Sequence, residues 1–215
     1  MAYDTPSLAF RCTIIAEQNL ALHGFAAASY NRSVPTLRLY PLPSQTMDTA
    51  SRFFDSIRVW LPRAHGMYAE GRGGSRLTVL DSGLVEIVGM STPSFGNTEN
   101  KHFPGWFAVD VAKLMVFAES LRVRAAKSSS SLVIECEFWH DGTAMSTRGG
   151  SWASDQVIVS TSDVTIGAFE ISGRDQFASA FSKIEAEIWY GLGQPRFTSL
   201  PIDFDKTIAN YLGAV

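Results

Sequence analysis

The stretch that decides the fold is RLTVLDSGLVEIVG, residues 76–89. Apolar and polar side chains alternate along Arg76–Leu80 and again along Leu84–Gly89, which is the pattern of two half-buried β-strands. Between them stands Asp81-Ser82-Gly83, a three-residue turn with glycine at the position that needs a left-handed backbone. Because so short a turn can only join antiparallel neighbours, the stretch predicts a β-hairpin and an antiparallel sheet.

The same period of two predicts further strands on both sides of this hairpin. A second hairpin is expected where Val157–Ser160 and Val164–Ile171 face each other across a three-residue turn. Residues 17–31 have mixed periodicity, which leaves helix and strand both open. The remaining predicted strands are Leu8–Ile15, Thr36–Tyr40 and Leu132–Trp139.

Three stretches repeat apolar residues every three or four positions, as amphipathic helices do. They are Thr46–Leu61, Asp110–Lys127 and Arg174–Tyr190. Ser172 and Asp175 form a capping-box pattern at the start of the last helix. These elements predict a single α+β domain over residues 1–215, a largely antiparallel sheet with three helices packed on it. Between residues 36 and 139 their order also matches the βαββαβ arrangement of a ferredoxin-like core.

The charge pattern excludes several classes of partner. The 215 residues carry 18 basic and 21 acidic side chains, a net charge of −3, and residues 151–215 are the acidic part. A nucleic-acid binder needs clustered lysines and arginines, and no such stripe is present. No run of 18 apolar residues predicts a membrane span, and the opening Met1-Ala2-Tyr3-Asp4 lacks the features of a signal peptide. The expected partner is a protein, and an acidic end suits a basic one.

Only two cysteines occur, Cys12 and Cys136, and both stand among apolar residues of predicted strands. With no metal-ligand spacing, we expect two buried free thiols in the reducing environment of the cytoplasm. The histidines form no HxH or HExxH pattern, and no phosphate-binding or nucleophile-elbow motif precedes a helix. The sequence therefore predicts neither a metal site nor a cofactor.

One group of residues could carry chemistry. Glu135 and Glu137 are two apart on a predicted strand, so both side chains point to the same face, and Asp141 follows at the strand end. Neighbouring carboxylates can share a proton or hold a divalent cation. The alternative is a solvated strand face whose acids are balanced by basic residues on the next strand.

A second group could bind a protein partner. Trp189 and Trp152 stand at a helix end and in a predicted loop, where exposed aromatic residues act as interface anchors. Glu185, Glu187 and Asp175 could add negative charge around Trp189. In the alternative interpretation, Trp189 packs inward at the end of the apolar stripe of its helix.

Residues 109–190 resemble small, uncharacterised bacterial domains that accompany polymorphic toxins as presumed immunity proteins. The resemblance rests on Val109-Asp110-Val111 with Leu114, Phe117 and Leu121, on the strand before Asp141-Gly142, and on Trp152, Val157-Ile158-Val159 and Phe169-Glu170-Ile171. It implies a cytoplasmic, non-catalytic protein that neutralises a protein partner. Two other functions stay open, an enzyme that uses Glu135, Glu137 and Asp141, and a structural subunit of a phage or secretion apparatus.

Overall fold

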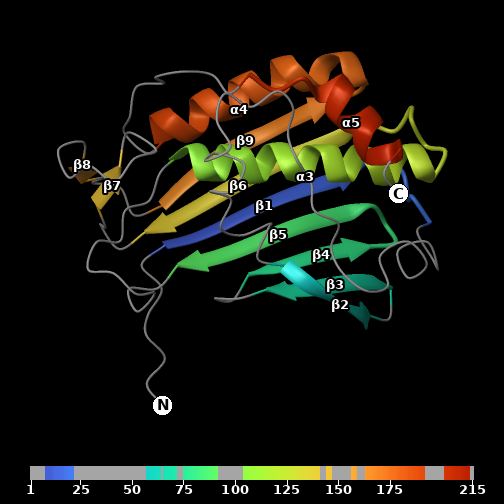
Figure 1. Cartoon of the computed structure of the whole chain (residues 1–215), viewed down its shortest axis with the longest axis horizontal. Helices are drawn as coiled ribbons and strands as arrows, with labels where there is room; N and C mark the ends of the chain where they lie inside the picture. The colour runs from blue at the N-terminus through green and yellow to red at the C-terminus, as the bar shows by residue number, and fades with distance from the viewer. Residues whose placement is uncertain are drawn as a thin grey trace.

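The computed structural model describes residues 8–21, 57–63, 65–71, 75–91, 104–140, 144–146, 156–158, 163–191 and 201–213. Within these residues an antiparallel sheet carries three helices, which confirms the α+β class. The strands of the sheet are β1 (Leu8–Ala16), β2 (Ile57–Arg63), β3 (Gly66–Gly71), β4 (Arg76–Leu80), β5 (Leu84–Ser91), β6 (Leu132–His140) and β9 (Asp163–Ile171). Their order across the seven-stranded sheet is β2-β3-β4-β5-β1-β6-β9 (Figure 1).

The predicted hairpin is confirmed. β4 and β5 pair antiparallel, and Gly83 in the turn has a φ of 95°. The Gly83 N–H donates to the carbonyl of Leu80 at 2.9 Å, which closes the turn. A side chain at this φ would strain the backbone, and this explains why glycine stands here.

β1 is the central strand, and it pairs with β5 on one side and β6 on the other. Its residues Phe10, Cys12, Ile14 and Ala16 are buried in the core. Its odd-numbered residues Arg11 and Ile15 are exposed on the opposite face. The alternation read from the sequence therefore assigns the correct residues to each face of this strand.

The helices are α3 (Pro104–Arg124), α4 (Phe177–Gly191) and α5 (Phe204–Gly213), and all lie on one side of the sheet (Figure 1). α3 packs on β1 and β5, α4 packs on β9, and both α4 and α5 contact α3. Every residue from 107 to 122 is buried, because the sheet lies on one side of α3 and the other helices on another. Such a helix is apolar around most of its circumference, which agrees with the sequence of α3. Among the described residues, no helix combines the length and the apolar character that a membrane crossing requires.

The helix expected over Thr46–Leu61 is wrong at its C-terminal end, because Ile57–Arg63 forms β2 and pairs with β3. The sequence Ile57-Arg58-Val59-Trp60-Leu61 also alternates with a period of two, and pairing with β3 decides for the strand. Residues 46–56 and the predicted strand Thr36–Tyr40 lie outside the described residues. The third described helix is α5, which the sequence patterns did not indicate.

The second predicted hairpin is also wrong. β8 (Gln156–Ile158) pairs with β7 (Ala144–Ser146) in a separate two-stranded sheet, and β9 pairs with β6. β6 has nine residues, and its inward side chains Ile134, Cys136 and Phe138 are buried, so it offers β9 a much longer partner than the three-residue β8. The ferredoxin-like core is not confirmed, because β2, β3, β4 and β5 are consecutive neighbours in the sheet.

Candidate functional site

The face of the sheet opposite α3, α4 and α5 is here called the open face. The strand register brings residues from different strands into rows across it. One row contains Glu70 of β3, Arg76 of β4, Val88 of β5, Arg11 of β1, Glu137 of β6 and Thr165 of β9. The next row contains Tyr68, Thr78, Glu86, Thr13 and Glu135.

Ion pairs link these two rows. The Arg11 Nε lies 3.5 Å from a carboxylate oxygen of Glu137 and 3.7 Å from one of Glu86. A second arginine, Arg76, lies 3.6 Å from the other oxygen of Glu86. The side chains of Arg11, Arg76 and Glu137 are 50%, 43% and 53% exposed and that of Glu86 is 19% exposed, so water reaches every pair from at least one side. The group Arg11, Glu86 and Arg76 is here called the exposed triad.

Glu135 and Glu137 thus share a face, as their spacing predicts, and both are exposed. Glu137 is paired with Arg11 from the neighbouring strand, and Glu135 stands opposite Thr13. The third predicted member, Asp141, lies outside the described residues. Within the part of the chain that the structure describes, no three histidine, cysteine or acidic side chains gather as a metal site would require.

A hollow of about 380 Å³ adjoins the Arg11–Glu137 pair. Strand alternation puts six of its lining residues on the open face. Those six are Ala9, Arg11, Val88, Glu137, Trp139 and Thr165. Its lining is apolar at Ala9, Val88 and the half-buried Trp139, and charged at Arg11 and Glu137. A volume of this size is near the lower end of ligand pockets, which begin at roughly 300 Å³.

The residues predicted to bind a partner do not form one exposed patch. Trp189 is 3% exposed and Glu185 is 1% exposed, so both face inward, whereas Glu187 and Asp175 are exposed. The inward-packing alternative for Trp189 therefore matches its position in α4. Trp152 lies outside the described residues.

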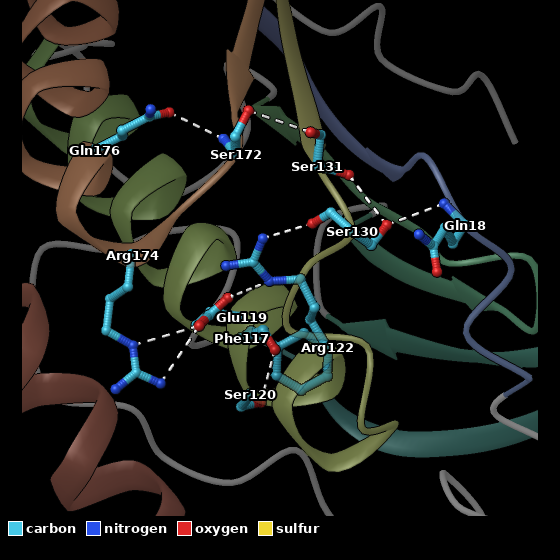
Figure 2. Close-up of polar contacts among 10 residues, drawn as sticks. All are labelled: Gln18, Phe117, Glu119, Ser120, Arg122, Ser130, Ser131, Ser172, Arg174 and Gln176. Carbon is cyan, nitrogen blue, oxygen red and sulfur yellow. Dashed lines mark hydrogen bonds and ion pairs between the residues drawn. The ribbon is translucent and has the colours of Figure 1, made fainter.

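On the helix side, a buried carboxylate holds two arginines (Figure 2). One oxygen of Glu119 accepts a 2.7 Å hydrogen bond from Arg122 Nε, and the other lies 3.3 Å from Arg174 Nη2. The side chains of Glu119 and Arg122 are 2% and 1% exposed. The side chain of Arg174 is 39% exposed and lies between Glu119 and the solvent. The group Glu119, Arg122 and Arg174 is here called the buried triad.

The buried triad is tied to backbone on several elements (Figure 2). Arg122 Nη1 donates to the Ser130 carbonyl at 2.6 Å, and the Ser130 hydroxyl accepts from the Gln18 N–H at 2.9 Å. Arg174 begins the short 3-10 helix η4 (Arg174–Gln176), which leads into α4. These contacts join the end of α3 to the residues after β1 and to the start of α4, which is a structural role.

The predicted capping box is wrong, because the N-cap of η4 is Gly173 and it makes no side-chain capping hydrogen bond. The side chain that returns to the Ser172 N–H is that of Gln176, whose Oε1 accepts at 2.9 Å (Figure 2). Asp175, the predicted second member, lies in η4, the 3-10 turn that precedes α4.

The cysteines are free and buried, as predicted. They stand opposite each other on β1 and β6, with the Cys136 thiol donating to Cys12 Sγ at 3.4 Å. Burial, then the contact with Cys136 and the negative charge of Asp110, raises the pKa of the Cys12 thiol well above its ordinary value. Since the thiolate is the reactive form, Cys12 is unsuited to act as a nucleophile.

The sequence analysis missed both triads. The members of the exposed triad occupy outward positions of correctly predicted strands, but which strands are neighbours was not readable. Glu119 and Arg122 are three apart on a predicted helix, a spacing that indicates a pair and could have been noticed. Comparison with models of protein families, with curated proteins and with solved structures found no match to this chain.

Proposed function

We propose that this chain is a non-enzymatic binding protein that holds a protein partner on the open face. The observation that carries the proposal is the hollow beside Trp139, with Val88 and Ala9 in its lining and the exposed Arg11–Glu137 pair next to it. An apolar centre inside a polar, solvent-accessible rim is the usual anatomy of a protein–protein interface.

The resemblance of residues 109–190 to immunity-type domains supports a more specific form of the proposal. In this form the partner is a toxin, and the chain neutralises it by binding in the cytoplasm. Two free thiols 3.4 Å apart suit a reducing compartment.

Photocross-linking in the protein's own cells tests the proposal. A benzophenone amino acid is incorporated at Thr165, an exposed residue that lines the hollow, or at Asn210, an exposed residue of α5. We expect one polypeptide to be linked through position 165 and not through 210. That polypeptide, expressed alone, should slow growth, and co-expression of this chain should restore it.

Two results would contradict the proposal. One is the absence of any cross-linked polypeptide at position 165 while the carrier protein is folded and abundant. The other is equal linkage from positions 165 and 210, which would show capture without a preferred surface. A linked polypeptide that binds through the open face but leaves growth unchanged would remove only the immunity role.

A further inference from the structure

The described part of the open face, on β3, β4, β5, β1, β6 and β9, is acidic. Among the strand residues whose side chains the structure describes there, five are glutamates and two are arginines. The glutamates are Glu70, Glu86, Glu135, Glu137 and Glu170, and the arginines are Arg11 and Arg76. The surplus of three negative charges among these described residues is a property of the folded sheet, because they come from six different strands.

The two arginines of this face are already engaged, and several carboxylates are not. Arg11 lies between Glu86 and Glu137, and Arg76 lies against Glu86. No ion pair within the described residues engages Glu135 or Glu70, and both are exposed. Among the side chains that the structure describes, the face therefore offers carboxylates to a cation, and both of its arginines already lie in ion pairs.

The hollow adds an apolar site on the same face of the sheet. Glu137 lines it, and Glu135 follows two residues earlier on the same face of β6. Its volume of about 380 Å³ admits one large side chain in contact with Trp139, Val88 and Ala9. An interface anchor of this kind contributes most when it fills a preformed pocket.

We propose that the partner presents a basic segment, in which one aliphatic or aromatic side chain fills the hollow and flanking lysines or arginines pair with Glu135, Glu137 and Glu70. This inference rests on the proposed function and specifies the chemistry of its partner. The acidic surplus repels nucleic acids and anionic lipid surfaces. It also disfavours a second copy of this chain, whose open face would bring the same surplus against it.

Three short capped peptides probe this chemistry with the full chain. They are Lys-Lys-Leu-Lys-Lys, Lys-Lys-Gly-Lys-Lys and Glu-Glu-Leu-Glu-Glu, titrated while amide shifts of the ¹⁵N-labelled protein are followed. We expect the leucine-containing basic peptide to bind and to shift the amides of Arg11, Glu137 and Thr165. Replacing its leucine with glycine should weaken binding about tenfold, and the acidic peptide should not bind.

Two pairs of matched variants locate the site. Glu135→Lys should weaken binding of the basic peptide about fivefold, whereas Glu187→Lys, the same charge change on the exposed side of α4, should leave it unchanged. Thr165→Trp places bulk in the hollow and should abolish the advantage of leucine over glycine. Its control is Ala178→Trp, at an exposed position of α4. Because all four positions are exposed, the variants should keep the dispersed amide spectrum of the parent.

Equal effects of Glu135→Lys and Glu187→Lys, or a preference for the acidic peptide, would overturn the inference. So would a leucine advantage that survives Thr165→Trp. If position 165 cross-links a partner in cells but the basic peptide does not bind, the inferred basic segment of the partner is wrong and docking on the open face stands. If position 165 links nothing, the proposed function itself fails, whatever the peptides do.

Discussion

Two triads of one glutamate between two arginines lie on opposite sides of the same sheet. In the exposed triad, Glu86 stands 3.7 Å and 3.6 Å from its arginines; those arginines are 50% and 43% exposed, and Glu86 between them is 19% exposed. In the buried triad, Glu119 stands 2.7 Å from Arg122, and both side chains are almost completely shielded. The composition is the same, but the Glu119–Arg122 contact is shorter and better shielded from water, so we expect the two triads to differ in their contribution to stability.

Water decides what each triad can do. Exposed ion pairs contribute little to stability, so a partner can replace them at small cost. A buried pair that loses one member leaves an uncompensated charge in the core, so a partner cannot replace either member without a large loss of stability. We therefore propose that the open face serves binding and that the buried triad serves structural support, and each proposal can be tested.

The largest effect is expected from Glu119→Gln. The charge of Arg122 would stay buried without its partner, at a cost of about 3–5 kcal/mol in the free energy of unfolding. Urea denaturation measures this loss. Replacing both members, as in Glu119→Leu with Arg122→Met, should recover part of it, because an apolar pair leaves no buried charge. A loss below about 1 kcal/mol for Glu119→Gln would show that water reaches the buried triad.

The rate of thiol labelling should report the loss of stability in Glu119→Gln independently. Cys12 and Cys136 are buried, so a thiol reagent reaches them only when the protein opens. We expect Glu119→Gln to speed labelling by at least about a hundredfold relative to the parent. Rapid labelling of both thiols in the folded parent would instead contradict their burial.

Glu86→Gln is the matched change in the exposed triad. It removes the same charge from between two arginines, yet we expect the free energy of unfolding to fall by at most about 1 kcal/mol. Thermal and urea denaturation of Glu86→Gln and Glu119→Gln, measured side by side, compare the two losses of stability. Equal losses at both positions would end the distinction between the triads.

The smallest effect is expected from Glu135→Gln combined with Glu137→Gln. Both side chains are exposed on β6, so each should change stability by less than about 1 kcal/mol, as at ordinary surface sites. Titration with Mg²⁺, Ca²⁺ and Mn²⁺ provides the second readout. Much weaker metal binding by the double variant than by the parent would favour the enzyme hypothesis over the binding one.

Local pattern was enough to predict much of the fold. The turn at Gly83 and the alternation along β1, β4, β5 and β6 are properties of neighbouring residues, and all of them were predictable. The segment Ile57–Leu61 satisfies both a helical and a strand period, and only pairing with β3 selects the strand. The pairing of β9 with β6 rather than with β8 likewise depends on tertiary structure, which the local pattern does not contain.

The candidate site was predictable only in fragments. The shared face of Glu135 and Glu137 follows from their spacing, but the pairing of Glu137 with Arg11 joins residues from strands far apart in the sequence. Arg174 reaches Glu119 across 55 residues for the same reason. The inward position of Trp189 depends on how α4 packs on β9, and the periodicity of the helix alone left both directions open.

The central claim is that the partner docks on the open face, and association kinetics test it most directly. The association rate of the polypeptide captured through position 165 is measured with the parent protein, with Glu135→Lys and with Glu187→Lys, each at low and at high salt. We predict that Glu135→Lys slows association about fivefold at low salt and flattens its salt dependence, while Glu187→Lys matches the parent. If Glu187→Lys slows association and Glu135→Lys leaves the association rate unchanged, the account is contradicted and the interface lies on the helix side.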